Sequence, residues 1–171
     1  EEVLDACLNA RHYARAAPGL LRPRRHLGAL PVATGVVEYR HPKGLVGIVS
    51  PWNYPLTLAA SDALPALVAG NAVLLRPDPQ TSLTALWILA LLREAGLPDD
   101  AMGVVLGEGP VIGPAVVAES DFVMFTGSTA VGRQVAEQCG RRLIGCSLEL
   151  GGKNAMIVRA DADPDEAAAI A

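Results

Sequence analysis

Aromatic residues are scarce in this chain, at 4% of its 171 residues. Proteins that bind single-stranded nucleic acid stack the bases on aromatic side chains, and few are available here. A continuous cationic stripe is also missing, because the formal net charge is −4 and the basic residues gather in two short groups, at 22–26 and 141–142. These absences exclude nucleic acid as an expected partner. We expect the basic group at 22–26 to be a solvated loop.

Cysteine is rare too, and the three that occur form no CxxC pair: Cys7, Cys139 and Cys146. An odd number without a histidine cluster supports neither a disulfide framework nor a zinc site. We therefore expect no metal and a reducing, cytoplasmic location. Each cysteine is expected to act as a small buried hydrophobic residue and not as a nucleophile. The histidines show no triad partner or metal-ligand spacing, so surface or packing roles are expected for His12, His26 and His41.

No apolar run is long enough to cross a membrane. Glycine, proline or charged residues interrupt each run before the ~18–20 residues that a span requires. The N-terminus shows no charged leader followed by an apolar stretch, so secretion is not predicted. With 51% hydrophobic and 19% charged residues, the chain can bury a sizeable core. We expect further chain or neighbouring subunits to cover excess apolar surface, so that the full-length protein is a homo-oligomer.

Both ends of the chain read as helices that lack part of their length. Residues Glu1–Ala17 have apolar side chains at helical spacing, but no capping residue precedes them. Asp163-Pro164-Asp165-Glu166 has the N-cap, the proline and the acidic first turn of a helix start. The sequence stops one or two turns later, and so short a helix is marginal by itself. We therefore expect a chain truncated at both ends.

Short apolar strands alternate with helical stretches along most of the chain. A connector, Leu20–Pro31, is followed by a predicted hairpin in which Val32–Arg40 and Gly44–Val49 flank a turn at His41-Pro42-Lys43-Gly44. The predicted helices after it are Leu56–Ala69, Ser82–Ala95, Val111–Ala118 and Ala130–Cys139. The predicted strands are Ala72–Leu75, Gly103–Leu106, Phe122–Phe125, Leu143–Leu148 and Ala155–Val158. This order predicts an α/β fold, a Rossmann-like parallel sheet with flanking helices.

Ligands of such sheets gather at the carboxyl ends of the strands, which makes the loops after Val49, Leu75, Leu106, Phe125 and Leu148 the candidate site. Two side chains on these loops suit the oxidation of a carbonyl compound. Asn53, in Ser50-Pro51-Trp52-Asn53-Tyr54-Pro55, can donate to a developing oxyanion. Glu149, beside Gly151 and Gly152, can act as a general base for a thiol or a water. We expect the five loops to converge on one cleft.

Three further loops are candidates for binding phosphate or ribose. The turn at Gly127-Ser128 opens a helix, so it is either an anion site or a plain helix cap. Gly107-Glu108-Gly109-Pro110-Val111-Ile112-Gly113 reads GxGxxxG where a dinucleotide fingerprint requires GxGxxG, which favours tight-turn glycines. Arg76-Pro77-Asp78-Pro79-Gln80-Thr81 offers a cation for ribose or its phosphate, or else a solvated turn in which Asp78 and Thr81 are caps.

Four segments occur in one order at spacings that resemble the aldehyde dehydrogenase superfamily. They are Pro51-Trp52-Asn53-Tyr54-Pro55, Ala69-Gly70-Asn71, Phe125-Thr126-Gly127-Ser128-Thr129 and Glu149-Leu150-Gly151-Gly152-Lys153. The resemblance extends from about Gly35 to the end of the chain. Within the superfamily, residues 76–81 and 143–149 look most like an NADP-type succinate-semialdehyde dehydrogenase. The resemblance implies NAD(P)-dependent oxidation of an aldehyde, and succinate semialdehyde as the small aldehyde substrate.

The resemblance also implies roles for particular residues. Asn53 would complete the oxyanion hole, and Glu149 would be the general base. Residues implied to bind the cofactor are Trp52 and Asn53 at the nicotinamide, Leu150 at its ribose, Gly127 and Ser128 at the pyrophosphate, Arg76, Pro77, Asp78 and Pro79 at the adenosine ribose, and Gly109 and Gly113 at the adenine. The implied division of the chain is a helix and connector at 1–31 and an NAD(P)-binding domain at 32–171.

Three departures from the superfamily pattern matter. Arg76 stands where the superfamily usually has lysine, and Pro79 stands where many NAD-preferring members have a glutamate for the ribose hydroxyls. Without that carboxylate a 2′-phosphate meets less repulsion, so we expect NADP, with NAD as the alternative. The catalytic cysteine follows Glu-Leu-Gly-Gly by a few tens of residues in the superfamily, beyond Ala171. The chain is therefore expected to lack the catalytic domain and to be inactive alone. Rival hypotheses are a non-catalytic nucleotide-binding or assembly module and a coenzyme A-acylating dehydrogenase.

Overall fold

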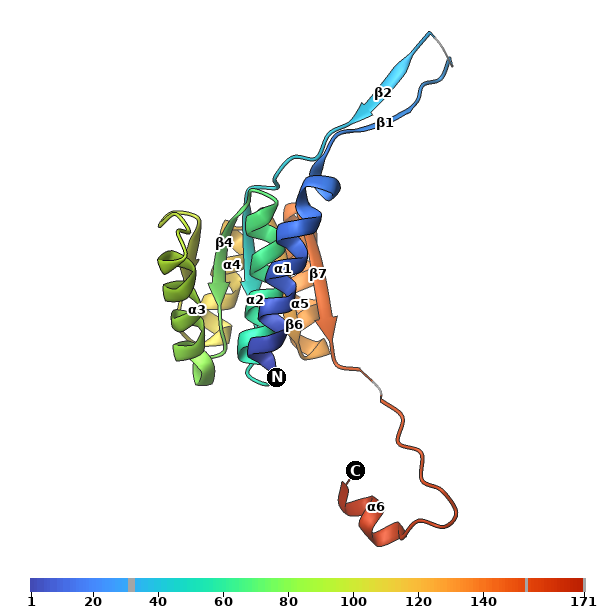
Figure 1. Ribbon diagram of the computed structural model, residues 1–171. Coiled ribbons are helices and arrows are strands. Elements are labelled where there is room, and N and C mark those ends of the chain that lie inside the picture. Colours follow the sequence, from blue (N-terminus) through green and yellow to red (C-terminus); the bar gives the residue numbers. More distant parts are fainter. Residues whose placement is uncertain (31–32, 153, 171) are drawn as a thin grey trace.

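The computed structural model describes residues 1–30, 33–152 and 154–170. Its centre is a parallel sheet in the order β5-β4-β3-β6-β7 (Figure 1). The strands are β3 (Leu45–Val49), β4 (Ala72–Arg76), β5 (Met102–Val104), β6 (Phe122–Gly127) and β7 (Gly145–Leu150). Short runs of branched apolar residues form these strands because helices cover both faces of the sheet. The α/β, Rossmann-like prediction is confirmed.

Two pairs of helices cover the sheet, one pair on each face. The first core lies between the sheet and α2 (Pro55–Val68) and α3 (Ser82–Glu94), where Ala59, Ala63, Ile88 and Leu89 meet Ile48 and Leu75. The second core lies against α4 (Gly109–Glu119) and α5 (Thr129–Arg142), where Val116, Val117 and Val135 meet Val123 and Phe125. These alternating side chains give the two faces of the sheet different surroundings, which matters for the site below.

The chain reverses its direction of travel across the sheet between β5 and β6. From β3 it moves outward to β4 and β5, and it then returns to place β6 on the other side of β3. The point between β3 and β6 is therefore a topological switch point, where the loops of two adjacent strands diverge to opposite faces. A crevice is expected there, at the carboxyl ends of both strands.

A helix at the N-terminus, α1 (Glu2–Leu21), packs along α2 on the outside of the domain (Figure 1). No residue of α1 is fully buried. Two sets of polar contacts join the helices. The Glu2 carboxylate accepts from the backbone N–H groups of Leu56 and Thr57, and the Asn9 amide donates to Ser61 Oγ at 3.3 Å. The helix predicted at Glu1–Ala17 is thus confirmed and extends one turn further.

The predicted hairpin is wrong. β2 (Gly35–Glu38) pairs antiparallel with β1 (Arg24–Leu27), whereas Leu45–Val49 is the central strand of the parallel sheet. The expectation of a loop at 22–26 is wrong for the same reason, because Arg24 begins a strand. Val32, where the first strand of the hairpin was predicted to begin, lies outside the described residues. The ribbon of β1 and β2 projects from the sheet, with all eight residues exposed (Figure 1).

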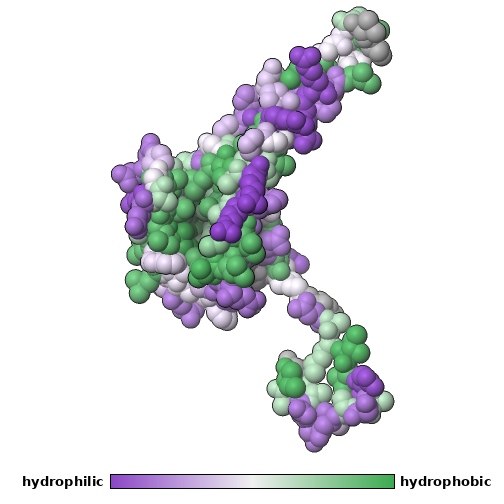
Figure 2. All heavy atoms as spheres, viewed as in Figure 1, coloured by the Kyte–Doolittle hydropathy of each residue, from purple (hydrophilic) through white to green (hydrophobic). Residues whose placement is uncertain are grey.

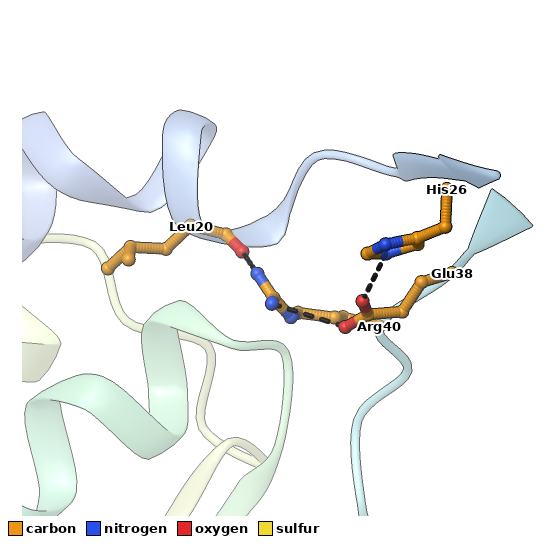
Figure 3. Close-up of polar contacts among 4 residues, drawn as sticks. All are labelled: Leu20, His26, Glu38 and Arg40. Atoms are coloured by element: carbon orange, nitrogen blue, oxygen red, sulfur yellow. Dashed lines mark hydrogen bonds and ion pairs between the residues drawn. The ribbon is translucent and has the colours of Figure 1, made fainter.

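Charged side chains hold the base of this ribbon (Figure 3). His26 Nε2 lies 2.9 Å from Glu38 Oε2, and Arg40 Nη2 lies 3.2 Å from Glu38 Oε1. Arg40 also donates to the backbone oxygen of Leu20, the end of α1. These contacts lower the pKa of Glu38, chiefly through the His26 hydrogen bond. These contacts join the two strands of the ribbon to each other and to the end of α1.

The C-terminal part of the chain extends away from the sheet as far as α6 (Pro164–Ile170) (Figure 1). Asp163 caps α6 as predicted, accepting from the N–H of Asp165 at 2.8 Å. The strand predicted at Ala155–Val158 is wrong, because no strand among the described residues pairs with this segment. Ile157 keeps 88% of its surface exposed. Within the described residues, none of the helices combines the length and the apolarity needed to span a membrane.

Other boundaries differ by one to three residues from those predicted. Leu143, predicted to begin a strand, ends α5 in the left-handed conformation with φ 57°, so β7 starts at Gly145. Cys139 is buried, as expected, but Cys146 is half-buried and Cys7 is exposed, because α1 presents Cys7 away from α2. Figure 2 shows hydrophobic side chains gathered over the body of the domain, while the base of the ribbon is mainly hydrophilic.

Candidate functional site

A cavity of about 430 Å³ opens at the switch point, on the face of the sheet that α4 and α5 cover. Its walls come from the loops after β3, β4 and β6 and from one face each of α4 and α5. Seven of the residues predicted to bind the cofactor line it: Trp52, Arg76, Asp78, Gly109, Gly113, Gly127 and Ser128. Four of the five predicted loops therefore converge here, including the one after Leu106 that leads into α4.

Arg76 places a buried positive charge at this cavity. Its side chain sits at the end of β4 with only 7% of its surface exposed. Arg76 Nη2 donates to the backbone oxygen of Gly107 at 2.9 Å, but Nε has no partner among the described residues. A buried, unpaired donor on a cation is costly unless a ligand completes it. Arg76 therefore points to an anionic or polyhydroxyl ligand.

Ser50 provides a second incomplete polar group in the same wall. It follows β3, keeps 3% of its surface exposed, and its hydroxyl has no partner among the described residues. Its N–H donates to the backbone oxygen of Arg76 at 3.1 Å, which joins the ends of β3 and β4. The buried unpaired side-chain atoms found in the described chain thus belong to two residues, and both line the cavity. This coincidence makes the cavity the candidate place for a polar ligand.

Two helices begin at the rim of the cavity. Gly109 and Pro110 start α4, and a Cβ on Gly109 would lie 3.4 Å from Arg76 Nη2, so glycine leaves the guanidinium room. Ser128 is the N-cap of α5, and its Oγ accepts from the N–H of Val131 at 3.4 Å. The cap interpretation of Ser128 is confirmed. The cap does not exclude an anion, because the next N–H groups of a helix N-terminus are free and the helix dipole is positive there.

The loop after Arg76 is only partly arranged as expected. Asp78 caps the short 3₁₀ helix η1 (Pro79–Thr81), its Oδ1 accepting from Gln80 N–H at 3.0 Å. Thr81 forms no side-chain cap for α3. Pro77 is buried and Pro79 is exposed, and neither lines the cavity. The polar contribution of this loop to the cavity therefore comes from Arg76 and Asp78.

Asn53, Glu149 and Leu150 do not line the cavity, which corrects the expectation of a single cleft. Leu148 and Leu150 pack into the core against α4 and α5, so the alternation along β7 points Glu149 to the other face. That face is covered by α2, and Asn53 lies in the loop immediately before α2. Asn53 and Glu149 are both exposed. The two residues thus share one side of the sheet, opposite the cavity. Trp52, the chain neighbour of Asn53, lines the cavity.

Asp62 on α2 lies on the same side of the sheet as Asn53 and Glu149. Burial, together with the negative charge of Glu149, raises the pKa of Asp62 to about 6. Asp62 adjoins Ala63, which is buried against the sheet. Two carboxylates therefore lie close enough to repel one another on the α2 face. Sequence reasoning missed Asp62, and the only available signal was an acidic residue amid the apolar stretch 56–69.

Sequence reasoning also missed the contribution of α5 beyond its first turn. Val131, Gln134 and Gln138 line the cavity on one face of that helix. Their spacing of three to four residues is a signal that helical periodicity could have supplied. Ser50 had no such signal, since a serine at a strand end is common. The described residues contain no cluster of histidine, cysteine and acidic side chains that could hold a metal.

The whole chain, residues 1–171, matches the aldehyde dehydrogenase family. It is 58% identical over 168 residues to a Mycolicibacterium smegmatis protein named "Putative succinate-semialdehyde dehydrogenase (NADP(+))", which covers 98% of this chain and 32% of that protein. The chain thus spans about a third of the length of the curated relatives it matches.

Solved structures agree with this match. The fold is similar to NADP-dependent glyceraldehyde-3-phosphate dehydrogenase from Bacillus halodurans complexed with NADP, with a TM-score of 0.83 and 37% identity over 95% of this chain and 35% of that one. It is also similar to NAD-dependent benzaldehyde dehydrogenase from Corynebacterium glutamicum, with a TM-score of 0.82 and 36% identity over 98% of this chain and 37% of that one. The cavity at the switch point and these similarities agree, and the chain belongs to the aldehyde dehydrogenase family.

Proposed function

We propose that this chain is the nucleotide-binding part of an NADP-dependent aldehyde dehydrogenase that oxidises succinate semialdehyde. The observation that carries the proposal is the cavity at the switch point, where Arg76 and Ser50 each present a buried polar atom without a partner. NADP carries phosphates and ribose hydroxyls, which could be the hydrogen-bond partners that these two side chains do not have within the chain. When bound, NADP accepts the hydride that leaves the substrate.

The shape of the cavity suits the parts of a dinucleotide. Arg76 would meet the adenosine ribose or its 2′-phosphate, and the start of α5 at Gly127 and Ser128 would meet the pyrophosphate. Gly109 and Gly113 would leave room for the adenine, since α4 presents no Cβ at these positions. Trp52, which also lines the cavity, would lie near the nicotinamide, and Leu150 would meet the nicotinamide ribose. These assignments extend the family match to individual residues.

The preference for NADP over NAD rests on charge. Arg76 is the buried cation of the cavity, and Pro79 offers no carboxylate to bind ribose hydroxyls. Asp78 is an opposing negative charge in the lining, but one of its oxygens already accepts from Gln80 N–H. We therefore assign the 2′-phosphate to Arg76, and NAD remains the alternative cofactor. The relatives include both an NADP-dependent and an NAD-dependent enzyme by name.

Asn53 and Glu149 would serve the reaction from the α2 face. The Asn53 amide would donate to the oxygen of the substrate carbonyl as negative charge develops on it, and Glu149 would take the proton of an attacking water. Succinate semialdehyde is the proposed substrate because the relatives at 51–58% identity carry that name. We also assign the enzyme to the cytoplasm and to a homo-oligomer, since its cysteines are unpaired and apolar side chains remain exposed.

The test is a kinetic assay of the full-length protein encoded by the reading frame that contains this chain. Succinate semialdehyde and NADP should give NADPH, followed by its absorbance, with a higher kcat/KM than NAD gives. Asn53→Ala should lower kcat by about 10²–10³, the usual effect of removing an oxyanion donor. Binding of NADP without turnover of any aldehyde would favour a non-catalytic nucleotide-binding module, and dependence on coenzyme A would favour an acylating enzyme.

A further inference from the structure

Helix α2 begins without a cap from its own residues. Tyr54 is at the N-cap position and makes no side-chain hydrogen bond to the helix, and Pro55 is the first helical residue. A helix N-terminus leaves its first N–H groups without intrahelical partners, and an uncapped start destabilises the helix. The loop that carries Asn53 ends at this point. The start of α2 must therefore be held by something outside residues 50–55.

Glu2 on α1 supplies the missing cap. Its Oε2 accepts from the N–H of Leu56 at 2.9 Å and from the N–H of Thr57 at 3.0 Å, although Glu2 lies more than fifty residues earlier in the chain. The Glu2 side chain is half-buried in this contact. A carboxylate is the favoured partner here, since it satisfies two donors at once and lies at the positive end of the helix dipole.

The contact is a specific part of the interface between α1 and α2. Farther along the interface, the Asn9 side-chain amide donates a hydrogen bond to Ser61 Oγ at 3.3 Å. Ser61 lies about a turn and a half into α2. Asn9 is itself held by the backbone oxygen of Asp5 at 3.2 Å. Asn9 therefore joins the two helices without touching the start of α2. The pair offers a matched comparison, because the Glu2 contact lies at the start of α2, next to the Asn53 loop, and the Asn9 contact lies farther along α2.

We propose that Glu2 is a positioning residue, whose carboxylate fixes the first turn of α2 and so sets where the Asn53 amide lies. The role of Asn53 as an oxyanion donor rests on the proposed function, whereas its placement by Glu2 does not. Ser50, Pro51 and Trp52 of the same loop line the nucleotide cavity, but they lie farther along the chain from Leu56 and Thr57 than Asn53 does. Loss of the Glu2 contact should therefore affect the chemical step more than cofactor binding.

The first experiment follows the Asn53 side-chain amide and the amides of Leu56 and Thr57 by NMR in the chain itself. Glu2→Ala should shift all three resonances and increase the motion of residues 53–57 on the fast timescale, while Asn9→Ala should leave them as in the wild type. Glu2→Gln keeps an accepting oxygen and should give an intermediate result. Unchanged Asn53 and Leu56 signals in folded Glu2→Ala would overturn the proposal, whatever the enzyme does.

The second experiment measures kinetics in the full-length protein. Glu2→Ala should lower kcat by about tenfold or more with a smaller change in the KM for NADP, Glu2→Gln should recover part of kcat, and Asn9→Ala should match the wild type. Equal losses in Glu2→Ala and Asn9→Ala would mean that α1 merely stabilises the fold, and would overturn the positioning role. If the wild type oxidises no aldehyde, the proposed function fails, and the NMR comparison then decides on Glu2 alone.

Discussion

Arg76 is the residue whose surroundings explain most about the cavity. Its guanidinium is removed from water at the end of β4, with one hydrogen bond to Gly107 and a free Nε. A cation in such a position is stabilised mainly by what binds beside it, because a buried charge without a partner costs several kcal/mol. Because β4 buries Arg76 at its end, the cavity favours a ligand with an acceptor or a negative charge at this point.

Replacing Arg76 should weaken NADP binding more than NAD binding. A hydrogen bond to a charged group contributes about 1.5–3 kcal/mol, which is roughly 10- to 100-fold in the dissociation constant. Arg76→Met should show this loss for NADP in a calorimetric titration, and Arg76→Lys, which keeps the charge, should show less. An equal loss for both cofactors would place Arg76 at a part that they share, and not at the 2′-phosphate.

Asp62 should make stability depend on pH in the acid range. Its pKa is about 6 in the folded chain and 3.8 as the ordinary value, so between these values the folded state holds a proton that the unfolded state has lost. Stability is therefore expected to fall as pH rises from about 4 to about 6. Asp62→Asn mimics the protonated form and should gain on the order of 1 kcal/mol at neutral pH, after allowance for solvent screening.

Urea unfolding of the wild type and of Asp62→Asn at pH 4 and pH 7.5 checks this sign. The variant and the wild type should be nearly equal at pH 4 and should separate at pH 7.5. Glu149→Gln is the matched control, because it removes the neighbouring charge and leaves the burial, so it should give a smaller gain. A variant that is less stable than the wild type at pH 7.5 would show that Asp62 is stabilised as a carboxylate.

At the scale of the elements, the close packing of β3 against α4 shapes the cavity wall. Gly47, in the middle of β3, faces Val116 and Ser120 of the helix region, and a Cβ there would lie 2.8 Å from Val116 Cγ1 and would overlap Ser120 Oγ. Ser120 is fully buried, and its hydroxyl donates to the backbone oxygen of Val116 at 2.6 Å. Glycine thus lets α4 approach the central strand.

Gly47→Ala is expected to lower the free energy of unfolding by about 1–3 kcal/mol, the usual cost of overpacking a core. Gly140→Ala is the control, since nothing lies within 4 Å of a Cβ at that helical position and alanine favours a helix by up to about 1 kcal/mol. Urea unfolding measures both. A neutral result for Gly47→Ala would mean that α4 can move outward freely, and that the cavity wall is softer than its packing indicates.

Sequence patterns predicted the elements that bury apolar residues and missed those that do not. Helices α2 to α5 and strands β3 to β7 were found because each has an apolar face against one of the two cores. Of the ribbon, β2 lies within the predicted strand Val32–Arg40, whereas β1 and its pairing with β2 were not predicted. All residues of both strands are exposed, so no alternation marks them. Ala155–Val158 was wrongly predicted because apolar residues alone do not supply the neighbouring strand that pairing needs.

The residues of the candidate site also fall into those that the sequence predicted and those that it did not. Residues in strand-end loops, such as Arg76 and Ser128, were placed correctly at the cavity because parallel strands gather their carboxyl ends. The face to which Glu149 points was not predicted, since it depends on the register of β7 against β6. Ser50 and Asp62 were missed because burial and a neighbouring charge arise from residues distant in the sequence.

At the scale of the whole molecule, the domain carries two projections that pack little against it. The ribbon extends from one end of the sheet and the segment after β7 from the other (Figure 1). Leu27 and Ile157, in these two projections, keep 87% and 88% of their surfaces exposed. An isolated two-stranded ribbon is marginally stable in water. Both projections therefore gain little stability from packing against the domain.

The measurement that tests the nucleotide site most directly is an NMR titration of the chain with NADP. Shifts should be confined to the loops after β3, β4 and β6, to the end of β7 and to α4 and α5, with the Arg76 Nε–H and the Ser128 amide among the most affected. NAD should move the same signals, with a smaller effect at Arg76. Absence of shifts at Arg76, Ser50 and Ser128 at saturating NADP, or shifts confined to the α2 face, would contradict a nucleotide in this cavity.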